Sequence, residues 1–164
     1  MLLLDSQRGI AEVTDNTTIL NSYNTGDIKA HMQSAGIVAT PYFDEIYNSY
    51  NVGEIYTERD MLWTGGISGQ PATITNCYNL GKVTNGGEIT GLQGVSEIKN
   101  VYYISGRNLV GDDYIQGTVT NAVEMTESEM RSQKLVDALN ANIGDNTEWA
   151  RWKLGPKGYP VLDI

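Results

Sequence analysis

Apolar and polar positions recur in a fixed order along the first two thirds of the chain. A ten-residue block is aliphatic at its first position, asparagine at its third, tyrosine at its fifth, glycine at its eighth and aliphatic at its tenth. Copies of this block start at Ile19, Ile46 and Ile74, and a looser copy, with one residue inserted before its glycine, starts at Ile98. The lead asparagines are 27, 28 and 24 residues apart. A recurrence of this length is typical of proteins that stack one structural unit.

A second, shorter pattern follows each block and completes the unit. Glycine, an aliphatic residue, any residue and a small residue occur at 36–39, 66–69 and 91–94. Residues 9–12 are similar and lie ten residues before Ile19, as Gly36 lies ten before Ile46. We therefore expect the chain to start inside a repeat, as an excised fragment or behind an artificial start, with further coils once upstream.

The repeat predicts a mainly β fold, namely a parallel β-solenoid of about four coils. The unit is too short for paired-helix repeats, and its Gly, Asn and β-branched content opposes helices. By analogy with known β-helices we expect right-handed coils. Residues 1–117 are assigned to the solenoid and residues 118–164 to a C-terminal capping region.

Coils stacked about 4.8 Å apart turn each repeated position into a ladder of like side chains. Isoleucines are expected to form an apolar interior ladder, lead asparagines an amide ladder and tyrosines a stack of rings. Glycines are expected at the turns. These residues are Ile19, Ile46, Ile74 and Ile98; Asn21, Asn48, Asn76 and Asn100; Tyr23, Tyr50, Tyr78 and Tyr102; and Gly26, Gly53, Gly81, Gly36, Gly66 and Gly91.

The C-terminal region carries the pattern of a helix followed by a short strand. Thr126 and Glu129 form a capping box at the start of a helix expected near 127–142. Trp149 and Trp152 follow this helix. An uncovered last coil would expose its core and an unpaired strand edge, so we expect the helix and the two tryptophans to cap it.

Composition excludes several classes of function. One cysteine and one histidine leave no disulfide framework and no Cys/His metal cluster, so we expect no metal and no other cofactor. The net charge of −9 disfavours nucleic acid and anionic lipid as partners. No apolar stretch approaches the roughly 18–20 residues of a membrane-spanning helix, so no membrane insertion is expected.

Three charged residues, Asp27, Glu54 and Lys82, share the slot after the turn glycine. Carboxylates one coil apart would lie close to the roughly 5 Å separation of a retaining glycosidase, which would suit a β-helical polysaccharide hydrolase or lyase. A solvated ladder, in which the lysine relieves repulsion, explains the same pattern. We favour the ladder because catalysis needs a site as well as a spacing, and we assign no catalytic residue.

Other reactive residues have structural explanations too. His31 is a candidate base with Asp44 or Glu45, but it lies in the variable, loop-like part of the repeat. Cys77 shares its slot with Ser22, Ser49 and Val101, which indicates a packed small residue rather than a nucleophile. Calcium binding at Asp112 and Asp113 is weighed against a turn. Exposed aromatic residues would stack on sugars or cover a coil edge, and the candidates are Tyr47, Tyr56, Trp63 and Tyr114.

The repeat resembles the GLUG repeat of bacterial surface proteins. Asn-[Ser/Cys]-Tyr-Asn-x-Gly-x-[Ile/Val], followed by Gly-[Leu/Ile]-x-Gly, carries the resemblance. The final coil at 100–103, with residues 125–130 and 158–162, is similar to the way such arrays end, so the resemblance covers nearly the whole chain. Residues 91–94 match the naming motif outright, whereas residues 36–39 depart from it twice. The resemblance implies a secreted or wall-attached bacterial protein with a β-helical stalk.

Similar repeats occur in adhesin-like proteins and in the non-catalytic part of immunoglobulin A-cleaving metallopeptidases. The single His31 rules out the zinc motif His-Glu-x-x-His, so any protease activity of a parent protein would lie outside this chain. We expect a non-catalytic structural or adhesive segment whose partners are flanking domains of a larger surface protein. A glycan- or host-protein-binding module on one solenoid face is the alternative, and the hydrolase or lyase is a second.

Overall fold

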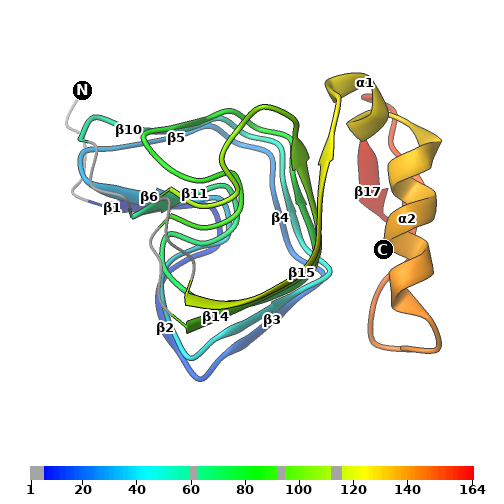
Figure 1. Cartoon of the computed structure of the whole chain (residues 1–164), viewed down its shortest axis with the longest axis horizontal. Helices are drawn as coiled ribbons and strands as arrows, with labels where there is room; N and C mark the ends of the chain where they lie inside the picture. Colours follow the sequence, from blue (N-terminus) through cyan, green and yellow to red (C-terminus); the bar gives the residue numbers. More distant parts are fainter. Residues whose placement is uncertain (1–5, 60–62, 92–94, 112–115) are drawn as a thin grey trace.

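The computed structural model describes residues 6–59, 63–91, 95–111 and 116–164. Successive segments stack in parallel as the coils of a mainly β solenoid, which confirms the predicted fold class. Three full turns separate Ile19 from Ile98, and the strand after that begins a further turn. Viewed along the stack, the coils overlie one another and the two helices stand to one side (Figure 1).

Each coil contributes short strands to parallel sheets, of which the largest runs the length of the solenoid. The strands are β1 (Ser6–Arg8), β2 (Ala11–Asp15), β3 (Thr18–Leu20), β4 (Tyr23–Asn24), β5 (Ile28–Ala30), β6 (Gln33–Ala35), β7 (Val38–Tyr42), β8 (Glu45–Tyr47), β9 (Tyr50–Asn51), β10 (Ile55–Thr57), β11 (Thr64–Gly65), β12 (Thr73–Asn79), β13 (Val83–Thr84), β14 (Val95–Ile104) and β15 (Gln116–Met125). The largest sheet has the order β15-β14-β12-β8-β3, with β4 and β9 beside it. The others join β1 with β6 and β11, β2 with β7, and β5 with β10 and β13.

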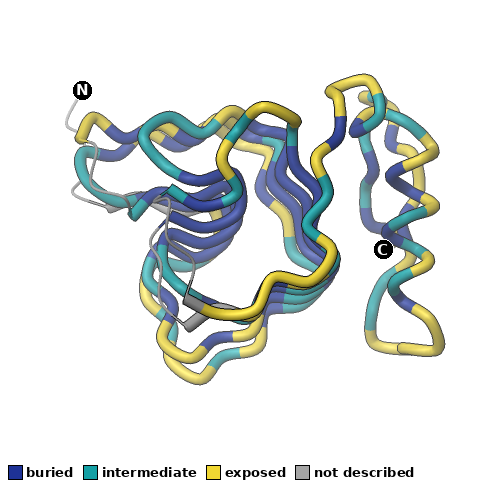
Figure 2. The backbone as a smooth tube through the Cα atoms, viewed as in Figure 1, coloured by how far each residue is buried: buried dark blue, intermediate teal, exposed yellow. Residues whose placement is uncertain are grey.

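The isoleucine ladder fills the interior as predicted. Ile46 pairs with Ile19 on one side and with Ile74 on the other, and Ile74 pairs with Ile98. All four side chains are buried in one core cluster, together with Cys77 from the small-residue slot. The buried positions of successive coils therefore lie above one another, as Figure 2 shows.

The lead asparagines turn the chain and form the predicted amide ladder. Asn21, Asn48 and Asn76 have φ of 50°, 49° and 55°, a left-handed region that asparagine tolerates better than most residues. Asn48 Nδ2 donates to Asn21 Oδ1 at 2.7 Å, and Asn76 Nδ2 donates to Asn48 Oδ1 at 2.8 Å. The predicted rung between Asn76 and Asn100 is replaced by other contacts: Asn76 Oδ1 accepts from Asn142 of the C-terminal region at 3.0 Å, and Asn100 Oδ1 accepts from Asn121 of the next strand at 2.8 Å.

Three of the four ladder tyrosines stack ring on ring. The ring centroids of Tyr23 and Tyr50 lie 5.2 Å apart, and those of Tyr50 and Tyr78 lie 5.1 Å apart. Tyr102 follows Tyr78 in register and accepts a hydrogen bond at its hydroxyl from Asn142 at 2.9 Å. Burial raises the pKa of Tyr78 well above its usual value, so its hydroxyl stays neutral.

Two of the turn glycines, Gly53 and Gly81, are needed because backbones of adjacent coils approach closely. A Cβ atom on Gly53 would lie 2.0 Å from the carbonyl oxygen of Gly26, and one on Gly81 would lie 2.0 Å from that of Gly53. In the second half of the unit, a Cβ on Gly36 would lie 2.2 Å from the carbonyl oxygen of Gly66, and one on Gly66 would lie 2.1 Å from that of Glu88. The backbone N–H of Gly91 donates to the carbonyl of Ser68 in the previous coil at 3.0 Å. None of these predicted glycines has a positive φ, whereas the lead asparagines do.

A second amide ladder inside the solenoid was not predicted from the sequence. Asn24 Nδ2 donates to Asn51 Oδ1 at 2.8 Å, and Asn51 Nδ2 donates to Asn79 Oδ1 at 2.7 Å. Each of these side chains also donates to the carbonyl oxygen two residues ahead, which closes its own turn. The repeated Asn-x-Gly therefore links coils and turns with the same amide.

The C-terminal region forms a compact unit of two helices and a hairpin. Its elements are α1 (Glu127–Met130), α2 (Gln133–Ile143), β16 (Trp152–Leu154) and β17 (Pro160–Leu162), with the two strands antiparallel. The predicted capping box is confirmed, since Glu129 N–H donates to Thr126 Oγ1 at 3.3 Å and Thr126 N–H to Glu129 Oε2 at 3.0 Å. The single helix expected near 127–142 is two helices, because Ser132 interrupts the first and caps the second.

The prediction that this unit caps the last coil is wrong. It lies along one side of the solenoid, next to the asparagine corner and the tyrosine stack (Figure 1). Asn21 Nδ2 donates to the carbonyl of Glu148 at 2.8 Å, and Asn48 Nδ2 donates to that of Ala150 at 2.9 Å. Asn76 Nδ2 reaches the carbonyl of Leu139 at 3.2 Å. The amides of three coils thus satisfy backbone groups of the unit, which sets its place.

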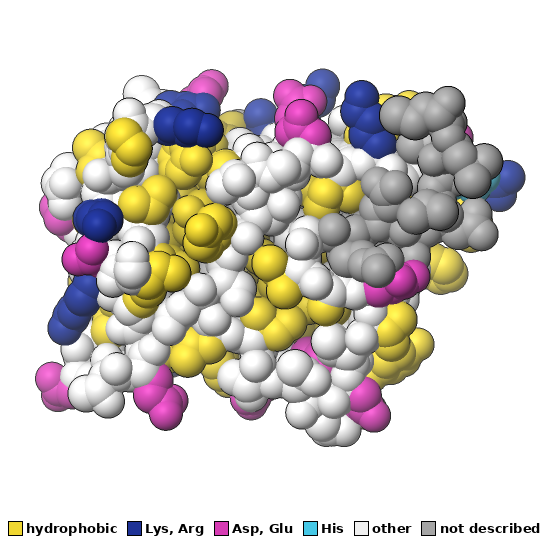
Figure 3. Space-filling view, turned by 180° about the vertical axis from the view of Figure 1, so that it is seen from behind, with side chains coloured by type: hydrophobic (Ala, Val, Ile, Leu, Met, Phe, Trp, Pro, Cys, Tyr) yellow, Lys and Arg dark blue, Asp and Glu magenta, His cyan; other side chains and the backbone are white. Residues whose placement is uncertain are grey.

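The two tryptophans serve this lateral contact. Trp152 is 3% exposed, packs beside Tyr50 and Tyr78, and donates from Nε1 to Asn48 Oδ1 at 2.7 Å. Trp149 stacks on Tyr47 with 5.7 Å between ring centroids. Seen from behind, hydrophobic side chains on this face gather toward the C-terminal unit, and charged side chains lie mostly at the rim (Figure 3).

The predicted boundary between residues 117 and 118 falls inside β15. This strand pairs with β14 over its whole length and places Val119 beside Ile98 and Asn121 beside Asn100. The coil therefore continues to Met125. The sequence does not reveal this copy, because it keeps only the aliphatic and asparagine positions of the block, without its tyrosine and glycine.

Candidate functional site

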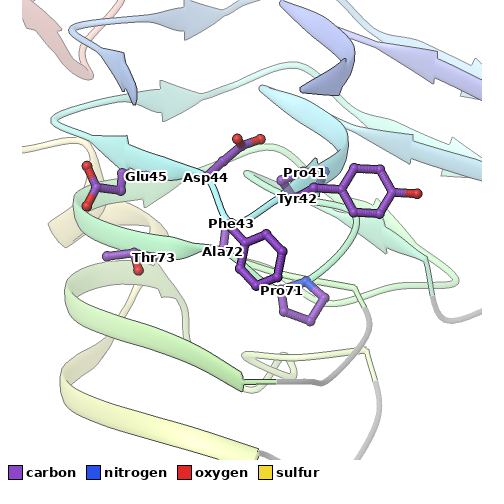
Figure 4. Close-up of a pocket in the computed structure, with 8 residues that line it drawn as sticks. All are labelled: Pro41, Tyr42, Phe43, Asp44, Glu45, Pro71, Ala72 and Thr73. Carbon is purple, nitrogen blue, oxygen red and sulfur yellow. The ribbon is translucent and has the colours of Figure 1, made fainter. Parts of the chain in front are cut away.

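A hollow of about 550 Å³ lies at a corner of the solenoid where β7 leads into β8 and where the next coil enters β12. Residues 41–45 and 71–73 line it. Figure 4 shows Phe43 beside Pro71 on one side of this hollow, with Glu45 and Thr73 on the other and Tyr42 turned outward. The volume is within the roughly 300–1,000 Å³ range of small-ligand sites. We call this hollow the aromatic corner.

Phe43 occupies a strained and exposed position. Its φ is 54° and its side chain is 87% exposed. The residue in the same slot of the previous coil is Asn16, with φ 47°, because Asp15 pairs with Tyr42 and the strands continue in register. Asparagine fits this backbone, whereas phenylalanine pays roughly 1–2 kcal/mol for it. Folding alone therefore favours asparagine at position 43, and strain of this kind points to function.

A buried carboxylate holds the corner in place. Asp44 is 1% exposed and accepts from the backbone N–H of Thr17 at 2.8 Å and from the hydroxyl of Thr14. Its own carbonyl accepts from Thr73 N–H at 3.0 Å, which ties the corner to the next coil. Asp44 is thus fully engaged in structure, and it ties the residue after Phe43 to the previous coil and to the next one.

Glu45 supplies the exposed charge at the aromatic corner. Its Oε2 accepts from the hydroxyl of Thr18 at 3.1 Å. Burial, the charge of Glu45 and a hydrogen bond to that carboxylate raise the pKa of Tyr47. Because a carboxylate has about four acceptor positions, these two contacts leave room for further donors.

The other candidate residues are placed apart from one another. Asp27 Oδ1 accepts from the backbone N–H of Glu54 at 2.9 Å, and both side chains are exposed on the turn with Lys82 in the following coil. His31 Nδ1 lies 2.8 Å from Glu58 Oε2, so its observed partner is neither of the two acids proposed from the sequence.

The sulfur of Cys77 is sealed inside the core. Its Sγ donates to the carbonyl of Thr75 at 3.3 Å, and burial raises its pKa to about 12. The thiol therefore stays protonated and inert, which confirms the interpretation as a packed small residue.

The candidate aromatic residues differ in their accessibility. Tyr47 is covered by Trp149, Trp63 is half-buried, and Tyr56 is exposed on another side of the solenoid. Asp112, Asp113 and Tyr114 lie outside the described residues, so the calcium hypothesis stays a prediction. In the part of the chain that the structure describes, no three His, Cys, Asp or Glu side chains gather as metal ligands would.

A buried acid closes the inner amide ladder. Glu88 Oε2 accepts from Asn79 Nδ2 at 2.6 Å, and its Oε1 accepts from Arg107 Nη1 at 3.3 Å. Burial raises the pKa of Glu88 above the usual 4.5, although Arg107 and the hydrogen bonds oppose this shift.

Replacing Glu88 by glutamine is expected to flatten the dependence of stability on pH. The folded-state pKa of Glu88 is raised, so its contribution is fully present below about pH 4.5 and is lost as the pH rises through the folded value. Glutamine does not titrate. The free energy of unfolding of Glu88→Gln, relative to the unmodified chain, should therefore increase from acid to neutral pH in urea titrations. A difference that stays constant with pH would contradict this prediction.

The aromatic corner was not among the sites predicted from the sequence. Phe43 and Pro71 fall between the two halves of the repeat, where the copies diverge. The sequence signal that could have identified this site is the replacement of Asn16 by Phe43 at the equivalent position of the next coil. None of the helices among the described residues is long and apolar enough to cross a membrane.

Comparison of the chain with models of protein families, with curated proteins and with solved structures finds no match.

Proposed function

We propose that this chain is a non-catalytic structural and adhesive repeat segment of a larger secreted or wall-attached bacterial surface protein of the GLUG-repeat type. Flanking domains of that protein would be its constant partners. The resemblance of the repeats to GLUG sequences supports the family and the location. The solenoid supports the role of a spacer, because stacked coils build length from nearest-neighbour contacts.

The hydrogen bonds of the repeated polar residues support a structural role for most of the chain. Both amide ladders link coils, and the outer one also binds the C-terminal unit. Asp27 and Glu54 share one backbone contact and are otherwise exposed on the turn. The repeats thus supply rigidity, which leaves recognition to positions where one coil departs from the others.

Phe43 is the observation that carries the adhesive part of this proposal. A large apolar side chain is held 87% exposed at a backbone conformation that suits asparagine. A backbone cost at a side chain that stays mostly exposed is expected where a residue is kept for binding. The aromatic corner is therefore the proposed contact surface.

The substitution Phe43→Asn is expected to separate adhesion from folding. Because asparagine tolerates the left-handed backbone, the free energy of unfolding should rise by about 1 kcal/mol. Beads coated with the chain should adhere to mucin- or polysaccharide-coated surfaces under flow, and the Phe43→Asn beads should lose this adhesion. Tyr56→Ala is the matched control, since Tyr56 is 41% exposed but lies away from the corner.

Release of reducing ends from the same polysaccharides tests the hydrolase alternative. No release is expected from the intact chain. Release that is lost in the double variant Asp27→Asn, Glu54→Gln would favour the enzyme.

In the adhesion experiment, equal adhesion of beads coated with Phe43→Asn and with the unmodified chain would contradict the adhesive role of the corner.

A further inference from the structure

We propose that the aromatic corner binds an uncharged sugar ring of a polysaccharide, stacked on Phe43 and hydrogen-bonded at its edge to Glu45. This inference rests on the proposed adhesive function and names the chemical class of its ligand.

The apolar side of the corner is a platform made by two coils. Phe43 belongs to one coil, and Pro71 takes the equivalent place in the next, since Glu45 pairs with Thr73. Figure 4 shows the two rings beside one another at the hollow. The face of a phenyl ring is electron-rich and attracts weakly positive C–H edges. A pyranose ring presents such C–H groups on its faces, so it would lie flat on this platform.

The polar side of the corner suits the hydroxyl groups at the edge of the same ring. The Glu45 carboxylate and the Thr73 hydroxyl both line the hollow. Glu45 has acceptor capacity beyond its contacts with Thr18 and Tyr47. A sugar hydroxyl that donates to an ionised carboxylate makes a charge-assisted hydrogen bond, which is stronger than one between neutral groups.

Charge at the corner selects against charged ligands. Anionic sugars would meet Glu45 on a chain of net charge −9. A basic peptide would find only one available carboxylate, because Asp44 is buried and already accepts two hydrogen bonds. An exposed ion pair contributes only about 0–1 kcal/mol, so a single carboxylate recognises a cation poorly. An uncharged ring with several hydroxyls uses the platform and the carboxylate together.

The corner is also built before any ligand arrives. Pro41 and Pro71 restrict the backbone at both of its edges. Asp44 ties the loop to Thr17 of the previous coil through its side chain and to Thr73 of the next coil through its carbonyl. Binding would therefore cost little ordering of the protein.

Affinity gel electrophoresis of the whole chain tests the ligand class. Three gels are compared. Two contain an uncharged polysaccharide, β-glucan in one and galactomannan in the other, and the third contains the anionic polysaccharide alginate. We expect at least one uncharged polysaccharide to slow migration in a saturable way, and alginate to have no effect. Binding should be about tenfold weaker for Phe43→Asn and about threefold weaker for Glu45→Gln, while Tyr56→Ala should bind like the unmodified chain.

The outcomes separate this inference from the function on which it rests. Adhesion of coated beads that depends on Phe43, together with no retardation in either uncharged gel, would overturn the sugar assignment and leave the adhesive role standing. Phe43-dependent binding of an arginine-rich peptide, without binding of sugar, would also overturn the sugar assignment and leave the adhesive role standing. Equal retardation of the unmodified chain and Phe43→Asn would overturn the site itself, provided that thermal melting shows both proteins to be folded.

Discussion

Replacing Trp152 by alanine is expected to lower the free energy of unfolding by about 3–5 kcal/mol and to loosen the C-terminal unit from the solenoid. Its indole packs beside the rings of Tyr50 and Tyr78 at 5.6 and 5.7 Å between centroids. It also donates to Asn48 Oδ1, deep in the contact between the unit and the coils. Alanine would leave a cavity there and remove that hydrogen bond.

Urea unfolding and limited proteolysis of the same samples measure this effect. The Trp152→Ala chain should show an early transition and faster cleavage within residues 126–164, before the coils unfold. Leu154→Ala is the matched control, because Leu154 lies on the same strand but is 45% exposed. Trp152→Phe keeps most of the packing and should cost about 1 kcal/mol for the lost hydrogen bond. Equal losses for Trp152→Ala and Leu154→Ala would contradict the lateral docking.

The position of the C-terminal unit could not be predicted from the sequence. The capping box of Thr126 and Glu129 is confirmed, but the tryptophans pack at the side of the solenoid and not over its last coil. Its place depended on which side of the coils presents amides with spare hydrogen-bonding capacity. Asn21 and Asn48 serve both as rungs of the ladder and as partners of the unit. A repeat pattern identifies such residues as a ladder but does not show what else they bind.

The solenoid fold could be predicted from the sequence for a physical reason. Once the period is known, every repeated position pairs with its own copy, so Ile46 must meet Ile19 and Ile74. Positions outside the repeated block have no such constraint. The aromatic corner lies in that variable part, and Phe43 becomes informative only when its backbone is compared with that of Asn16. Register was therefore predictable and the candidate site was not.

A methyl group at position 53 is expected to destabilise the solenoid by about 3 kcal/mol. The Cβ of Gly53→Ala would lie 2.0 Å from the carbonyl oxygen of Gly26 and 3.0 Å from the Asn24 amide nitrogen. Both neighbours are fixed, the first as backbone and the second as a rung of the inner amide ladder. The substitution therefore forces adjacent coils apart.

The same slot of the first described coil provides the control. A Cβ on Gly26 would meet only Asn24 Oδ1, at 3.7 Å, an ordinary van der Waals distance. Neither glycine has positive φ, so alanine is strained by its surroundings alone. Gly26→Ala should change stability by no more than about 0.5 kcal/mol. Thermal unfolding of Gly53→Ala and Gly26→Ala compares the same substitution in the same repeat slot, once against a close neighbouring backbone and once without one. Equal stabilities would mean that the coils are spaced more loosely than the ladders require.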